Sequence, residues 1–151
     1  MAAEVVRAYI LGTHGSLPTI DYASVGELLS DDLELIQEEA SHGKKALLEQ
    51  VYPGWASIVD GQSSVTLHAV AEAGDGTVLA HWETAYDVRD GSVWYGTDVD
   101  ISGAKVRGFQ VFASFTVVEG KIVRIVQRSD TVVKKLGIEA QVTAFRAKQS
   151  Q

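Results

Sequence analysis

The chain has 151 residues, of which 46% are apolar and 22% charged, and its formal net charge is −7 at pH 7. This composition excludes a mainly disordered chain, and the acidic balance argues against a sequence-independent binder of nucleic acid. The absence of cysteine excludes disulfides and zinc–thiolate sites. We expect one domain over residues 1–140 with a polar tail over 141–151, in a cytoplasmic protein without a signal peptide or membrane span.

The front half of the chain has a helical pattern. Apolar residues recur at helical spacing over 3–11, and glycines with a proline end that segment. A second helix is predicted over 22–29, followed by a short strand over 33–37. A third helix is predicted over 44–58, and Pro53-Gly54 indicates a kink or a break inside it.

The back half has a period of two, which predicts strands over 64–71, 77–88, 110–118 and 121–129, arranged as two hairpins. Between the hairpins, residues 89–108 carry four glycines and no clear period, so we expect either a functional lid or a disordered connector. Helices followed by such a meander predict an α+β domain. In it, helices pack on a strongly curved mixed or antiparallel sheet and enclose a cone-shaped cavity for a small ligand.

Strand parity assigns the first hairpin's side chains to two faces. Pairing across its turn sets Leu67 opposite Trp82, on an apolar face that Tyr86 extends, and we expect this face to meet the cavity.

The opposite face of that hairpin is polar, and its members are His68, His81 and Glu83. Two interpretations are open for them: a metal or acid–base site, or a cross-strand cluster on the outside of the sheet or at a subunit interface. We favour the cluster, because two histidines and one carboxylate without further ligands are a weak metal signal.

Parity in the second hairpin sets Val111 opposite Arg128 and Phe109 opposite Asp130, on the face that also carries Val126. We expect this face to line the cavity. Asp130 could serve as general acid or base, with burial raising its pKa and Arg128 lowering it, or the two could form a plain ion pair. Both interpretations stay open.

Single residues complete the set of candidates. Gln37 could donate a hydrogen bond to a substrate or be an exposed amide, and Trp55 could be core or a cavity wall that stacks on a substrate. Trp94 and Tyr95 suit either a lid over an apolar ligand or a subunit contact.

Three further polar residues lie in loop-like segments. We expect His14, between two glycines, to be exposed, and Asp98 and Asp100 to be solvated charges.

Several short motifs follow one another in a recognisable order. They are Leu28-Leu29-Ser30-Asp31-Asp32-Leu33, His42-Gly43-Lys44-Lys45-Ala46-Leu47, Gly120-Lys121-Ile122-Val123, Asp130 and Leu136-Gly137. Taken together over residues 5–137, they resemble the SnoaL-like polyketide cyclase family of the NTF2-like superfamily.

The resemblance implies a cone-shaped α+β barrel that pairs as a homodimer and works without metal or organic cofactor. Its implied activity is a cyclase or isomerase acting on a hydrophobic polyketide-type intermediate, with Asp130 at the family's acid–base position. The chain has Val126 where an aromatic is common, and no histidine over 85–90. These departures favour ring closure shaped by the cavity itself. A limonene-type epoxide hydrolase and a non-catalytic binding or dimerisation module are the alternatives.

Overall fold

The structure, a computed structural model, describes residues 1–38 and 40–150. Its helices are α1 (Ala2–Gly12), α2 (Tyr22–Glu27), α3 (Lys44–Ala46), the π-helical η1 (Leu47–Val51), α4 (Tyr52–Ala56), α5 (Val132–Lys135) and α6 (Glu139–Gln149). Its strands are β1 (Leu29–Gln37), β2 (Ala40–His42), β3 (Val59–Gly74), β4 (Thr77–Val88), β5 (Lys105–Val118) and β6 (Lys121–Ser129).

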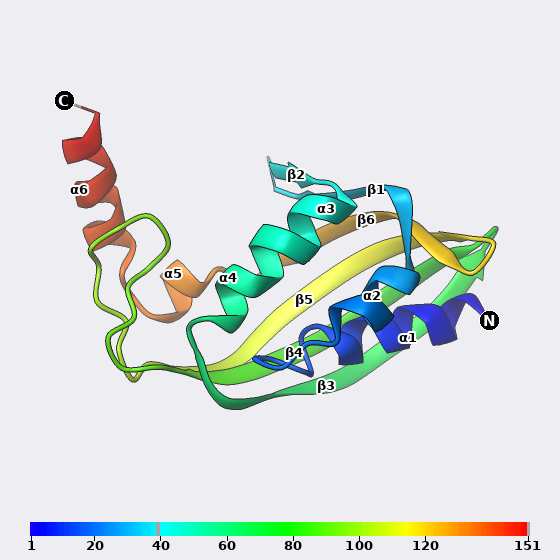
Figure 1. The fold of residues 1–151 in the computed structure, drawn as a ribbon, viewed down its shortest axis with the longest axis horizontal. Helices are drawn as coiled ribbons and strands as arrows, with labels where there is room; N and C mark the ends of the chain where they lie inside the picture. The colour runs from blue at the N-terminus through cyan, green and yellow to red at the C-terminus, as the bar shows by residue number, and fades with distance from the viewer. Residues whose placement is uncertain (39, 151) are drawn as a thin grey trace.

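The strands form one six-stranded sheet in the order β2-β1-β6-β5-β4-β3 (Figure 1). Both predicted hairpins are present, β3 with β4 and β5 with β6, and β5 also pairs antiparallel to β4. The early strand β1 joins the sheet parallel to β6, which makes the sheet mixed. The prediction of an α+β fold built on a curved mixed sheet is confirmed.

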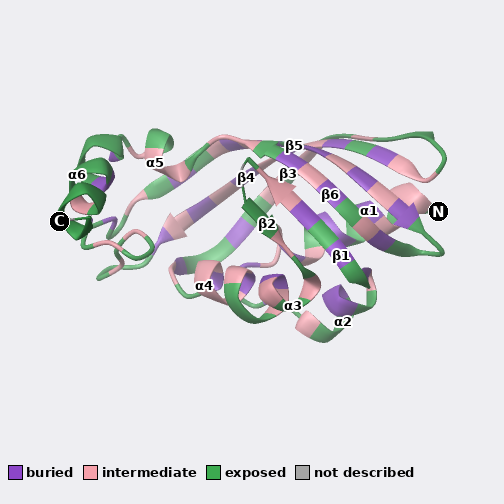
Figure 2. Ribbon diagram, turned by 90° about the horizontal axis from the view of Figure 1, so that it is seen from above, coloured by how far each residue is buried: buried purple, intermediate pink, exposed green. Residues whose placement is uncertain are grey.

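The helices α1 to α4 lie along one face of the sheet (Figure 1). The predicted apolar stripe of α1 consists of Val5, Val6, Tyr9 and Ile10. The last three have no exposed surface and Val5 is partly buried, because the stripe packs into the core over the sheet. Buried and accessible residues alternate in bands along the strands (Figure 2), as expected for a sheet with one covered face. Burial of this apolar face is the main stabilising contribution.

The third predicted helix is continuous but irregular. It runs through α3, the π-helical η1 and α4, and Pro53 stands in the first turn of α4. A proline ring crowds the carbonyl four residues before it and donates no hydrogen bond, so the wider π-turn ahead of Pro53 accommodates it. The irregularity predicted here therefore lies one turn earlier than Pro53, and it turns Leu47, Gln50 and Val51 toward the cavity described below.

Residues 89–104 form an ordered loop, and β5 already begins at Lys105. Within the loop, the Trp94 amide donates to the Val99 carbonyl at 2.9 Å and the Ile101 amide donates to the Ser92 carbonyl at 3.0 Å. Val99 and Ile101 are buried. These hydrogen bonds and anchors contradict the disordered-connector interpretation.

The expected polar tail is also structured. Residues 139–149 form α6, which stands beside the 89–104 loop at one end of the molecule (Figure 1), and Val142 on this helix is buried. Among residues 1–38 and 40–150, no helix combines the length and the apolar character that crossing a membrane requires.

Candidate functional site

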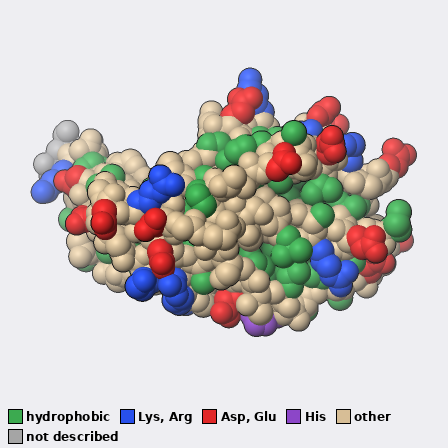
Figure 3. Space-filling model, turned by 60° about the horizontal axis from the view of Figure 1, so that its bottom comes forward, with side chains coloured by type: hydrophobic (Ala, Val, Ile, Leu, Met, Phe, Trp, Pro, Cys, Tyr) green, Lys and Arg blue, Asp and Glu red, His purple; other side chains and the backbone are tan. Residues whose placement is uncertain are grey.

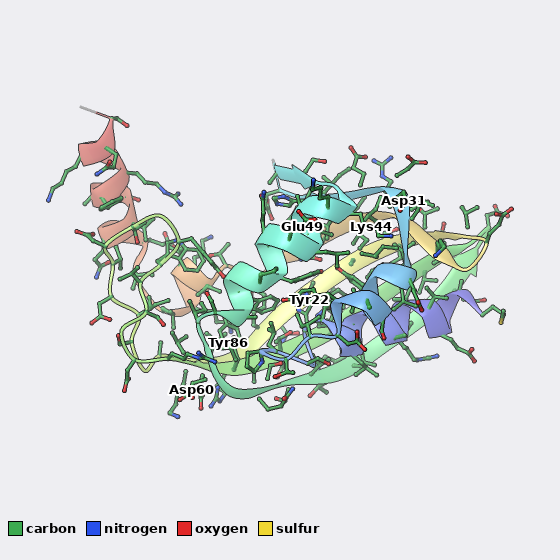
Figure 4. The ribbon with its side chains drawn as sticks, viewed as in Figure 1. Tyr22, Asp31, Lys44, Glu49, Asp60 and Tyr86 are labelled. Atoms are coloured by element: carbon green, nitrogen blue, oxygen red, sulfur yellow. The ribbon has the colours of Figure 1, made fainter. Side chains whose placement is uncertain are left out.

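A cavity of about 450 Å³ lies between the inner face of the sheet and the third helix. Its lining residues are His14, Leu35, Gln37, His42, Leu47, Gln50, Val51, Tyr52, Gly54, Trp55, Tyr86, Trp94, Tyr95, Phe109, Gln127 and Val132. Tyr86 of β4 lies below α4, at the sheet end where the 89–104 loop begins (Figure 4). The volume suits a drug-sized small molecule.

Aromatic rings form one end of the cavity. The ring centroids of Trp55 and Tyr86 lie 5.6 Å apart in an edge-to-face arrangement, and those of Trp94 and Tyr95 lie 5.0 Å apart. These rings line the space together with Gln37 and Phe109. For Trp55 and Gln37, the lining favours the cavity interpretation over a core ring and an exposed amide. The 89–104 loop thus contributes part of the wall, which agrees with the lid interpretation of its two aromatic residues.

Other residues expected at the cavity lie elsewhere. Trp82 and Val111 are fully buried in the core beneath the lining, while Leu67 is partly buried against the core. These three residues pack behind the lining residues and do not line the cavity themselves.

His14 is a cavity residue that the sequence analysis placed on the surface, and that prediction is wrong. Only 4% of it is exposed. The turn after α1 folds it inward: the Gly15 amide donates to the Ile10 carbonyl at 3.2 Å, and Ser63 Oγ of β3 donates to the His14 carbonyl at 2.7 Å. Nothing in the local glycine-flanked pattern signals these long-range contacts.

The contacts of the His14 ring fix its tautomer. The Trp82 indole Nε1–H, which can only donate, donates to His14 Nδ1 at 3.2 Å, and Thr84 Oγ1 lies 3.2 Å from the same nitrogen. Nδ1 is therefore the acceptor, and the ring proton resides on Nε2. None of the residues described in the structure accepts a hydrogen bond from Nε2, so this N–H is available to a ligand in the cavity.

Burial keeps His14 uncharged. Desolvation lowers the pKa of its imidazole from 6.5 to about 3. At physiological pH the ring is a neutral hydrogen-bond donor in a largely apolar space.

Two glutamines lie side by side on the floor, because Gln37 of β1 is in register with Gln127 of β6. Gln37 Nε2 donates to Ser129 Oγ at 3.1 Å. Gln127 is only 6% exposed, and none of the described residues hydrogen-bonds its side-chain amide.

Tyrosine hydroxyls supply further neutral polar groups. Tyr52 lines the cavity and its hydroxyl is hydrogen-bonded to that of the fully buried Tyr9. Burial raises the pKa of Tyr52 to about 12, and it raises the pKa of Tyr86 to about 12 as well. No Asp, Glu, Lys or Arg is among the described lining residues, and His42 is the second imidazole on the cavity wall.

The placement of Arg128 and Asp130 corrects the parity argument for β6. Val117 pairs with Ile122 as predicted, but Thr116 then pairs with Arg124, which leaves Val123 as a one-residue bulge. A bulge of this kind turns every later side chain of the strand to the opposite face. Ile125 and Gln127 therefore face inward.

Arg128 is consequently exposed on the outer face, and Val126 is displaced from the cavity with it. The Asp130 carboxylate accepts a hydrogen bond from the backbone N–H of Gln110 at 2.9 Å and lies 3.6 Å from Lys135 Nζ. It borders a separate surface hollow with Lys134 and Lys135. The prediction that Asp130 and Arg128 face the cavity as a catalytic pair is wrong.

The outer-face cluster His68, His81 and Glu83 exists, with Gln110 at its centre. His81 Nε2 lies 2.6 Å from Gln110 Oε1, Gln110 Nε2 donates to Glu83 Oε1 at 2.5 Å, and His68 Nε2 lies 3.4 Å from that carboxylate oxygen. The hydrogen bond from Gln110 and the contact with His68 lower the pKa of Glu83.

These contacts tie the members to one another across three strands, as the cluster interpretation expects. Among residues 1–38 and 40–150, no group of three His, Asp or Glu side chains converges as a metal-binding set.

The exposed Phe112 extends this outer face, stacked on His81 with ring centroids 4.1 Å apart. Elsewhere on the surface, acidic and basic side chains are interspersed, as Figure 3 shows for one side of the molecule. Lys44 of α3 and Asp31 of β1, for example, form an ion pair at 3.2 Å (Figure 4).

Comparison with known proteins places the fold. No family model matches the chain, and no curated protein matches its sequence. Among solved structures, a protein from Jannaschia sp. CCS1 named as a SnoaL-like polyketide cyclase is similar, with 17% identity, 92% coverage of both chains and a TM-score of 0.70.

An NTF2-like protein from Burkholderia thailandensis E264 is 18% identical over 91% of this chain and 97% of its own, with a TM-score of 0.63. An LEH-like epoxide hydrolase from M. tuberculosis is 19% identical over 90% of this chain and 86% of its own, with a TM-score of 0.62. The chain therefore has the NTF2-like fold of these proteins, as its motifs predicted.

Proposed function

We propose that this protein is a cofactor-free cyclase or isomerase that binds an uncharged, largely apolar polyketide-type intermediate in the 450 Å³ cavity. One observation carries the proposal: His14 is neutral and buried at the cavity, with its tautomer fixed and its Nε2–H unused by the described residues. Such a donor binds a substrate carbonyl oxygen and stabilises the negative charge that develops there during carbon–carbon bond formation.

The aromatic wall supports the same role. Trp55, Tyr86 and Trp94 hold an unsaturated chain by stacking, and a folded chain brings its reacting carbons together. Because no carboxylate or lysine is among the described lining residues, the site favours a closure that depends on positioning and carbonyl polarisation. Where a proton must leave carbon, His42 is the lining residue that would accept it.

An epoxide hydrolase of the limonene type fits this site less well, because that chemistry needs carboxylates to activate water. The described lining has none. A non-catalytic carrier of the same ligand remains the second candidate, since an apolar cavity with a few neutral polar groups is also what storage or transport requires.

A single experiment separates these functions. The purified protein is incubated with linear and partly cyclised polyketide intermediates in ¹⁸O-labelled water, and products are followed by mass spectrometry. We expect a product of unchanged mass, or of substrate minus water. A product that has gained labelled water would instead make the protein a hydrolase, and binding without turnover would make it a carrier.

The matched variant is His14→Asn. Asn keeps an oxygen near the Nδ1 position to accept from Trp82 but has no donor at Nε2. We expect it to remain folded and to turn over about 100- to 1,000-fold more slowly, the typical effect of removing one donor at a developing oxyanion. Unchanged turnover would remove His14 from the mechanism.

A further inference from the structure

The Gln127 amide is a buried polar group on the cavity floor whose hydrogen-bonding capacity is unused. The residue is 6% exposed, yet none of the described residues pairs with its carbonyl oxygen or its NH₂ group. Its neighbour Gln37 differs, because its NH₂ group donates to Ser129 Oγ. A ligand that fills the floor displaces water from Gln127 and must replace both a donor and an acceptor, or lose affinity.

The geometry of a primary amide restricts which ligand groups can do this. Its C=O and one N–H lie on the same edge, and a partner that presents N–H and C=O side by side forms two nearly straight hydrogen bonds with that edge. A lone carbonyl satisfies only the donor. A single hydroxyl cannot make both bonds in line. A carboxylate has no proton to donate, and no Lys or Arg among the described lining residues compensates its charge.

We propose that Gln127 is a specificity-determining residue that selects a ligand carrying a neutral cis-amide, such as a lactam ring. This inference rests on the proposed function, because it names the substrate class of the same cavity: an apolar polyketide-type skeleton into which an amide nitrogen has been built. The lactam lies against β6, and its apolar part extends across β5 toward His14.

The spacing of the two polar groups agrees with a ligand of this size. His14 contacts Trp82 and Thr84 of β4, whereas Gln127 is on β6, so β5 alone separates the two strands. Neighbouring strands are about 4.8 Å apart, which puts the two backbones roughly 10 Å from each other. Two fused rings bridge such a gap between side chains, with Phe109 of β5 lining the space between them.

A pair of probes tests the inference directly. The first, 2-quinolinone, is a flat bicyclic lactam, and N-methyl-2-quinolinone has the same ring and carbonyl but no N–H. Binding is measured by calorimetry, with quenching of tryptophan fluorescence as a second readout. We expect the native protein to prefer 2-quinolinone by roughly tenfold, the effect of one buried hydrogen bond and of the acceptor left unpaired without it.

Two variants show whether Gln127 causes the preference. Gln127→Leu keeps the volume and removes the amide, and we expect the two probes then to bind within about twofold of each other. Gln141→Leu is the matched control, because Gln141 is an exposed glutamine of α6 that is not among the described lining residues. It should keep the preference of the native protein.

Equal affinity of the native protein for both probes, or a preference that survives in Gln127→Leu, would overturn the inference, and so would failure of both probes to bind. Each of these results leaves the proposed function standing, because that depends on turnover and on His14. Conversely, if the protein shows a lactam preference that depends on Gln127 but no turnover, the role of Gln127 is supported and the proposed enzymatic function is refuted.

Discussion

The buried neutral His14 makes acid stability a measurable property of the site. Below pH 6.5 the unfolded chain binds a proton at this imidazole, whereas the folded protein does not do so until the pH falls to about 3. Lowering the pH through this window therefore favours unfolding. The stability that this residue contributes is present above pH 6.5 and is lost progressively as the pH falls toward 3.

The size of the effect follows from the two pKa values. Each pH unit inside the window costs about 1.4 kcal/mol, so His14 alone lowers the free energy of unfolding by roughly 3 kcal/mol between neutral pH and pH 4.5. The side chain is almost completely buried, so solvent does little to screen this cost. A loss of about this size is a large part of the stability of an ordinary domain.

Urea unfolding of the native protein and of His14→Asn, each at pH 7.5 and pH 4.5, measures this contribution. His14→Asn has no group that titrates here, so its loss of stability on acidification should be smaller than that of the native protein by roughly 3 kcal/mol. Gln127→Leu is the control: it alters the same cavity without removing a titrating group and should keep the native pH dependence. Equal losses in the native protein and His14→Asn would refute the buried neutral imidazole.

Three further predictions concern groups around the cavity and on the outer face. Trp94→Phe removes the indole N–H that is buried without a partner among the described residues, so we expect thermal unfolding to show unchanged or raised stability, by up to about 1 kcal/mol; a clear loss would indicate that this N–H is satisfied. Tyr52→Phe leaves the buried Tyr9 hydroxyl without its partner and should destabilise the fold by about 1–3 kcal/mol in the same assay, whereas no loss would mean that the pair is not coupled. If the chain pairs through its outer sheet face, Phe112→Asp, which puts a charge at a side chain that is 53% exposed there, should shift the mass measured by light scattering from dimer to monomer; an unchanged mass would contradict pairing through this face.

The predictions from sequence succeeded where a pattern is local and regular. The alternation along β4 and β5 correctly identified Tyr86 and Phe109 as inward-facing, and the glycine-rich turns correctly marked both hairpins. A side chain that faces inward does not necessarily line the cavity. Trp82 and Val111 face inward, but His14 and other core side chains cover them. Whether an inward-facing residue lines a cavity depends on the distance between the sheet and the helices that cover it. The residue pattern of a strand does not predict that distance.

The prediction failed on β6 through a single unpaired residue. Val123 is an ordinary strand residue, and no glycine or proline marks the bulge there. Because side chains alternate between the two faces of a strand, one bulge reverses the face of every later residue. Arg128 therefore faces outward and Gln127 inward, each opposite to the prediction. The bulge at Val123 therefore explains both why Arg128 and Asp130 do not face the cavity and why the Gln127 amide does.

The same electrostatics that weaken His14 as a base suit it as a hydrogen-bond donor. A group whose pKa is about 3 is a poor proton acceptor at neutral pH, since general bases work best with a pKa near the pH of the reaction. A neutral imidazole with a fixed tautomer, however, directs its N–H at a carbonyl oxygen without bringing a charge into an apolar space. The Trp82 indole holds that tautomer, because it can only donate to Nδ1. Burial therefore makes His14 a weak base but keeps its N–H neutral and fixed in direction. We expect this combination in a site that works by folding its substrate and polarising a carbonyl group.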